Sequence, residues 1–73
     1  MPHVVVKMKA GRTEEMKRRL AEQLTQAVVS ALGCEERVVS VDVIDVAPER
    51  WSADVYETEI SPRLDRLYKK PGD

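Results

Sequence analysis

The sequence predicts an α/β fold in which a long helix connects two parallel strands and a C-terminal helix follows. Three observations carry this prediction. Apolar and other side chains alternate over residues 3–9 and again over 38–46, and apolar residues recur every three or four positions over 14–32. A strand, a long helix and a second strand make a βαβ unit, whose crossover is right-handed in nearly all proteins. We expect residues 1–73 to form one domain.

Residues 3–9 are predicted to form the first strand, because valine is stiff and suits a pleated surface. One face carries Val4, Val6 and Met8, and the opposite face carries His3, Val5, Lys7 and Lys9. Ala10-Gly11-Arg12 then reads as a turn, in which glycine permits unusual backbone angles.

The predicted helix over 14–32 has a start signal and a stop signal. Thr13 is a suitable N-cap, acidic residues 14 and 15 complement the positive helix end, and Gly33 stands where a left-handed C-cap is favoured. The predicted apolar stripe consists of Met16, Leu20, Leu24, Ala27, Val28 and Ala31. The predicted solvent-facing side includes Lys17, Arg18, Arg19, Glu22, Gln23 and Gln26.

The second strand is predicted over 38–46 and the last helix begins near Ser52 or Asp54. We expect Pro62 to kink or split that helix, and Pro71-Gly72 to end it. Its predicted apolar stripe consists of Tyr56, Ile60, Leu64, Leu67 and Tyr68.

Composition narrows the class of protein. A chain of 73 residues buries only about 60% of its unfolded surface, so its core is marginal. Cys34 is the only cysteine and His3 the only histidine, which leaves no internal disulfide and no metal cluster. Self-association is the remaining way to stabilise so small a domain. We expect a homodimer with a four-stranded sheet, and a homohexamer is the alternative.

Charge and hydropathy exclude other classes. The formal net charge of −1 argues against a nucleic-acid partner, which would require a basic excess. The longest apolar run, residues 4–6, is far too short for a membrane span, and no signal peptide is visible. A lone thiol suits a reducing compartment, so we expect a cytoplasmic protein.

Pro2 is the first candidate for chemistry. Processing removes an initiator methionine that precedes a small residue, which would leave Pro2 with a free secondary amine. A free α-amino group titrates at about 7.7–8.0, and burial or neighbouring cations lower that pKa toward the range of a general base. The alternative interpretation is an ordinary strand-opening proline.

The order of these features resembles the 4-oxalocrotonate tautomerase family over residues 2–51. Met1-Pro2 opens a strand, Gly11-Arg12-Thr13 precedes a long helix, and a valine-rich second strand ends near Trp51. The tail through Lys69-Lys70-Pro71-Gly72 resembles a short bacterial branch that forms dimers. The resemblance implies the tautomerase fold, similar to that of macrophage migration inhibitory factor, and a keto–enol tautomerase that needs no cofactor.

The resemblance also implies roles for individual residues. Pro2 would transfer a proton on a small enol carboxylate such as phenylenolpyruvate or a 2-hydroxydienoate. Arg12 would bind the carboxylate through its planar guanidinium, and Trp51 would wall the pocket. The alternatives are a solvated turn arginine and a tryptophan that only packs in the core or an interface.

One position departs from the family. Its hexameric members carry a second arginine in the second strand, where this chain has Ser40. Losing such a cation costs roughly 10²–10³ in rate, so a monocarboxylate is a better substrate than a dicarboxylate. Ser40 would supply a weaker hydrogen bond, and Arg50 would compensate in part. His3 is interpreted first as a surface or interface residue and second as a pocket residue.

Two other functions remain as alternatives. Protonated Pro2 would assist the addition of water to an unsaturated or halogenated acid, although no acidic partner for the water is identifiable. If Met1 is retained, the Pro2 nitrogen is an amide without basicity, and the domain would be a non-catalytic oligomerising or ligand-binding module.

Overall fold

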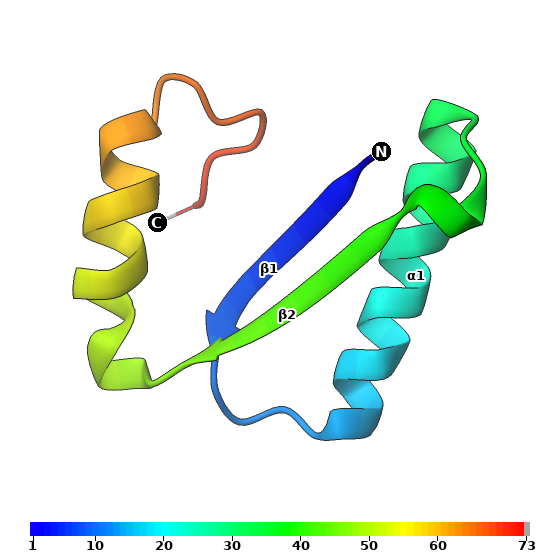
Figure 1. Ribbon diagram of the computed structural model, residues 1–73. Helices are drawn as coiled ribbons and strands as arrows, with labels where there is room; N and C mark the ends of the chain where they lie inside the picture. Colours follow the sequence, from blue (N-terminus) through cyan, green and yellow to red (C-terminus); the bar gives the residue numbers. More distant parts are fainter. Residues whose placement is uncertain (73) are drawn as a thin grey trace.

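The computed structural model describes residues 1–72 and confirms the βαβ unit (Figure 1). Strand β1 (His3–Lys9) leads through a turn to helix α1 (Glu14–Leu32), and strand β2 (Ser40–Val46) follows the short 3₁₀ turn η1 (Glu36–Val38). The C-terminal region contains the 3₁₀ turn η2 (Pro48–Arg50), the π-helix η3 (Ser52–Ile60) and the 3₁₀ turn η4 (Ser61–Arg63).

The two strands are parallel and paired along their full length. The register runs from His3 opposite Ser40 to Lys9 opposite Val46. A further backbone hydrogen bond from Ala10 N to Val46 O, 2.9 Å long, closes the ladder at its carboxyl end. The second strand begins two residues later than predicted, because Val38 belongs to η1.

Both predicted caps of α1 are present. The Thr13 hydroxyl accepts a hydrogen bond from Met16 N at 3.2 Å. Gly33 adopts a left-handed conformation, with φ of 67°, and its N–H donates to Val29 O at 2.9 Å. A residue with a Cβ is strained in this conformation, which explains glycine at this position.

Helix α1 packs on one face of the sheet. Of its predicted apolar stripe, Leu20, Leu24 and Val28 are half-buried, whereas Met16, Ala27 and Ala31 are exposed. The prediction that Lys17 faces solvent is wrong. Its side chain is 16% exposed and its Nζ lies 2.7 Å from Asp45 Oδ2 of β2 and 3.1 Å from Glu14 Oε1. Carboxylates on the sheet and on the helix therefore hold this lysine between the two elements.

The last helix is divided at Pro62, as predicted, but its second part is shorter than predicted. Element η3 ends at Ile60, the turn η4 contains Pro62, and Leu67 and Tyr68 lie outside any helix. Its buried contact is Val55, which is 5% exposed, whereas Tyr56 of the predicted stripe is 41% exposed. Wider helical turns with i→i+5 hydrogen bonds change which side chains share a face, so a stripe drawn for an α-helix leaves out Val55 and includes the exposed Tyr56.

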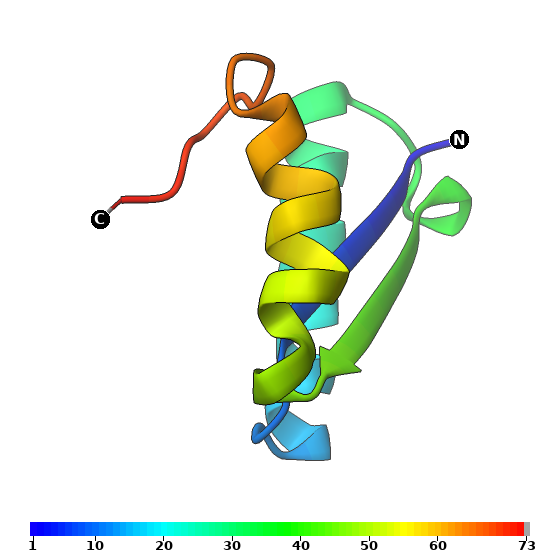
Figure 2. The same ribbon diagram turned by 90° about the vertical axis from the view of Figure 1, so that its left-hand side faces the viewer.

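The strands run between α1 and η3 in Figure 1, and Figure 2 shows η3 in front of α1. Within residues 1–72, Val55 is the most deeply buried residue. Several large apolar side chains remain accessible, including Val5 at 47% and Met16 at 51%. One chain therefore encloses only a small core, as its length predicts.

Candidate active site at the strand ends

Pro2, His3 and Ser40 meet at the amino ends of the two strands. Pro2 is half-buried, and its carbonyl oxygen accepts a hydrogen bond of 3.2 Å from Ser40 N. His3 and Ser40 are register partners, and His3 Nδ1 lies 2.6 Å from Ser40 Oγ. Because the sheet ladder holds all three backbones, this group has a defined geometry in the isolated chain.

Arg12 and Trp51 lie toward the opposite ends of the strands. Arg12 is exposed in the turn between β1 and α1, where its Nη1 donates to Lys9 O at 3.4 Å. Trp51 is half-buried and directly follows the turn η2 beyond β2. Parallel strands run in the same direction, so their carboxyl ends lie at the same end of the sheet. Arg12 and Trp51 both lie at that end.

The four sequence-predicted site residues thus form two separate groups in one chain. Each strand has seven residues. At about 3.3 Å per residue, a strand of this length spans roughly 20 Å. Pro2 and Ser40 therefore cannot contact the same small molecule as Arg12 and Trp51 of their own chain.

A cleft of about 310 Å³ opens between η3 and the sheet, near the carboxyl end of β2. Its walls include Lys7, Ile44, Val46, Arg50 and Val55. The two basic groups are paired with acidic residues from η3: Lys7 with Glu59, and Arg50 Nη2 with Asp54 Oδ1 at 2.7 Å. Both pairs hold η3 against the preceding structure.

Arg50 is consequently a poor replacement for the arginine that is absent at position 40. Its Nε also donates to Asp54 at 3.3 Å, which makes the pair bidentate. These hydrogen bonds raise the pKa of Arg50 above its ordinary value. A guanidinium already held by a carboxylate offers little to a second one.

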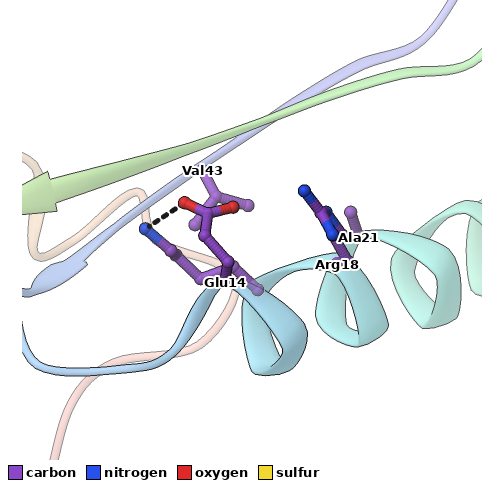
Figure 3. Close-up of a pocket in the computed structure, with 5 residues that line it drawn as sticks. Glu14, Arg18, Ala21 and Val43 are labelled. Atoms are coloured by element: carbon purple, nitrogen blue, oxygen red, sulfur yellow. Dashed lines mark ion pairs between the residues drawn. The ribbon is translucent and has the colours of Figure 1, made fainter.

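A second pocket, of about 190 Å³, lies between α1 and β2 (Figure 3). Glu14, Lys17, Arg18 and Ala21 of the helix and Val43 of the strand line it. The figure shows the Glu14 carboxylate beside the ion-paired lysine and Arg18 farther along the helix. Within residues 1–72, none of the four predicted site residues lines either pocket.

Neither a metal-binding cluster nor a membrane-spanning helix is present within residues 1–72. Residues 1–72 contain no group of three His, Cys, Asp or Glu side chains arranged to hold a metal ion. Over the same residues, no helix combines the length and the apolar character that crossing a membrane requires.

Sequence reasoning gave His3 a surface or interface role first and missed its contact with Ser40. The contact could be predicted only from the strand register, because residues 3 and 40 are far apart in the sequence. Once β1 and β2 are paired in parallel, these two polar side chains become direct cross-strand neighbours.

Comparison with known proteins agrees with this architecture. The family model described as tautomerase enzyme matches residues 2–57, beginning at Pro2. The protein Tautomerase PptA of Cronobacter sakazakii is 42% identical over 73 residues, which cover 99% of this chain and 96% of the relative.

Solved structures show the same similarity. A 4-oxalocrotonate tautomerase isozyme of Methylibium petroleiphilum is 40% identical with a TM-score of 0.67, covering 68% of this chain and 81% of that one. YwhB, a homologue of 4-oxalocrotonate tautomerase, is 32% identical with a TM-score of 0.66, covering 90% of this chain and 98% of that one. These similarities confirm the fold and the resemblance inferred from the sequence.

Proposed function

Since this chain belongs to the tautomerase family, we propose that it is a cofactor-independent keto–enol tautomerase with Pro2 as the general acid/base. The proposed substrate is a small enol monocarboxylate such as phenylenolpyruvate or a 2-hydroxydienoate. The observation that carries the proposal is the position of Pro2: it opens β1, it is half-buried, and the family match begins at this residue.

The proposed reaction needs only the amine of Pro2 once Met1 is removed. The nitrogen takes the proton of the enol hydroxyl, and the resulting ammonium returns a proton to the neighbouring carbon of the double bond. The product is the keto acid and the amine is regenerated. Proton transfer of this kind is efficient when the pKa of the base lies near the working pH. Desolvation and a nearby guanidinium would lower the pKa of the secondary amine into that range.

We propose that two chains complete each site as a homodimer. If two copies associate about a twofold axis with their strands antiparallel, the amino end of one strand pair meets the carboxyl end of the other. Pro2 of one protomer would then face Arg12 and Trp51 of its partner across a four-stranded sheet. The exposed apolar side chains, among them Val5, favour such an association.

The C-terminal segment favours the dimer over the hexamer. Element η3 covers the carboxyl half of the sheet face opposite α1, near Ile44 and Val46, and the Lys7–Glu59 ion pair fastens it there. A surface that η3 occupies is not free for contact with further dimers.

Arg12 and Trp51 have complementary proposed roles. The guanidinium of Arg12, whose one hydrogen bond within residues 1–72 is a long contact of 3.4 Å to Lys9 O, is proposed to bind the substrate carboxylate. The indole of Trp51 would exclude water and so help to lower the pKa of the Pro2 amine. Ser40 carries no charge, which is why we propose one carboxylate on the substrate rather than two.

The first prediction concerns Pro2. Intact-mass measurement of protein from its native cells should find the chain without Met1. Pro2→Ala should lower kcat/KM for phenylenolpyruvate ketonisation by about 10²-fold or more, because it removes the secondary amine and its tuned basicity.

Pro71→Ala is the matched control, because Pro71 lies exposed in the tail, and it should retain wild-type activity. Full ketonisation by Pro2→Ala, or a native chain that keeps Met1, would overturn the assignment.

A further inference from the structure

We propose that His3 is a second substrate-contacting residue, oriented by Ser40, which donates a hydrogen bond from Nε2 to the substrate oxygen that gains charge. The inference rests on the proposed function and adds to it a donor from the same chain as Pro2. It also gives Ser40 a positioning role through His3 in place of direct contact with the substrate.

The contact between the two side chains fixes the imidazole. His3 Nδ1 lies 2.6 Å from Ser40 Oγ, a short hydrogen bond between register partners on adjacent strands. The backbone of Ser40 is fixed in turn, because its N–H donates to Pro2 O at 3.2 Å. Side chains held on paired strands keep a more defined geometry than side chains on loops.

The proposal assigns the Ser40 hydroxyl as the donor in this contact and Nδ1 as the acceptor. When the Ser40 hydroxyl donates to Nδ1, the proton of the neutral ring is on Nε2. Nε2–H is then a directed donor on the side of the ring away from Ser40. A neutral imidazole in this form stabilises negative charge that develops on a carbonyl or enol oxygen.

In the single chain, the surroundings leave this donor accessible to a small molecule. His3, Val5, Ser40 and Asp42 share the sheet face opposite α1 and all four are exposed. Element η3 covers that face only farther along the strands, around Ile44 and Val46. His3 directly follows Pro2, and their Cα atoms are about 3.8 Å apart. Strand alternation points the imidazole to the sheet face opposite the Pro2 ring, so the proposal requires the enol to extend from the backbone nitrogen of Pro2 to that face.

The proposed chemistry needs a donor at this end of the sheet. As the enol loses its proton to Pro2, negative charge builds on the enol oxygen, and a preorganised donor stabilises it. Arg12 of the same chain belongs to the other end of the strands, and the Arg12 that the proposed dimer brings to this site is assigned to the substrate carboxylate. Arg37, which precedes β2, pairs with Glu35 at 2.9 Å. Beside Pro2, the side chains of His3 and Ser40 can both donate a hydrogen bond, and we assign the substrate contact to His3 because the Ser40 hydroxyl is engaged with Nδ1.

The first experiment compares His3→Gln with His3→Asn. The glutamine amide reaches the position of Nε2, whereas the asparagine amide reaches only that of Nδ1. We expect His3→Gln to keep kcat for phenylenolpyruvate ketonisation within about threefold and His3→Asn to lose about tenfold or more, mainly in kcat, because the lost interaction strengthens in the transition state. Intact mass must confirm that Met1 is removed from each variant.

The second experiment tests Ser40 by ¹⁵N NMR of the His3 imidazole. His3 is the only histidine in the sequence, so its ring signals need no assignment to a residue. Ser40→Thr keeps the hydroxyl and Ser40→Val has the same shape without it. We expect Thr to preserve the Nδ1 shift and the kcat, and Val to change both. Addition of phenylpyruvate, the keto product, should shift Nε2 in the wild type.

The outcomes separate the two proposals. If Pro2→Ala is inactive while His3→Asn and Ser40→Val match the wild type, the tautomerase assignment stands and the role of His3 is wrong. An Nε2 signal that phenylpyruvate leaves unchanged also overturns the role of His3. If Pro2→Ala is fully active, the proposed function fails and this inference fails with it. Loss in His3→Asn with retention in His3→Gln and Ser40→Thr supports it.

Discussion

Lys17 illustrates how one charged side chain can depart from the periodicity of its helix. By sequence it belongs to the polar side of α1, yet its ammonium is held by Asp45 of β2 and by Glu14. The aliphatic part of a lysine packs well against an apolar surface while its charged end reaches a partner. Asp45 is on the α1-facing side of β2, and that position turns the lysine inward.

The pH dependence of stability should report this lysine. The hydrogen bonds that Lys17 donates, first to Asp45 and then to Glu14, raise the pKa of Lys17 above its ordinary value of 10.5. The unfolded chain therefore loses this proton at lower pH than the folded chain. The stabilisation is fully present below about pH 10.5 and is lost as the pH rises through the folded-state pKa.

We expect the free energy of unfolding of the wild type to fall more steeply above pH 10.5 than that of Lys17→Gln, as measured by urea denaturation. Lys70→Gln, in the exposed tail, is the control and should follow the wild type. Parallel curves for wild type and Lys17→Gln would show that the ion pairs contribute nothing.

The elements of the fold differ in how locally they are encoded. Helix α1 begins at a threonine that caps it and ends at a glycine that adopts a left-handed conformation, and both signals are readable without any tertiary contact. Element η3 lacks such signals: none of its flanking side chains caps it. Its shape depends on Val55 packing and on the Lys7–Glu59 and Arg50–Asp54 ion pairs.

The N-cap of α1 provides the prediction at this scale. Thr13→Ala removes the hydroxyl that accepts from Met16 N at 3.2 Å. We expect it to lower the free energy of unfolding by about 1 kcal/mol, as measured by denaturant titration. Thr13→Ser keeps the hydroxyl and should lie within a few tenths of a kcal/mol of the wild type. Equal losses in both variants would assign the effect to the methyl group instead.

At the scale of the whole molecule, the separation of the two residue groups has a functional consequence. Pro2 and Ser40 occupy one end of the strands, and Arg12 and Trp51 the other. If each site is completed by two protomers, two inactive variants with defects in opposite groups should restore activity when combined.

Mixing Pro2→Ala with Arg12→Gln after joint unfolding and refolding tests this directly. Half of the dimers would be mixed, and each mixed dimer would hold one intact site and one doubly defective site. We therefore expect about one quarter of the wild-type activity from a random mixture. Mixing Pro2→Ala with Pro2→Gly is the control and should restore nothing. If the first mixture also stays inactive, the two groups do not share a site between protomers.

The sequence predicted the features that depend on neighbouring residues. Alternating valines predicted both strands, Thr13 and Gly33 predicted the ends of α1, and Met1-Pro2 with Arg12 and Trp51 indicated the family that the comparisons confirm. The parallel pairing of the two strands was also predicted and is confirmed. Three predictions about side-chain packing and the last helix were wrong. Lys17 was assigned to solvent, the last helix was extended to Tyr68, and Val55 was left out of its apolar stripe.

What the sequence determined by itself is the order of elements, because caps, turns and hydrophobic periodicity act over a few residues. What only the tertiary structure decided is which side chains meet. The parallel register places His3 beside Ser40, and the length of the strands places Arg12 and Trp51 far from Pro2. Cross-strand contacts join residues distant in the chain, so they follow from pairing and packing rather than from local propensity.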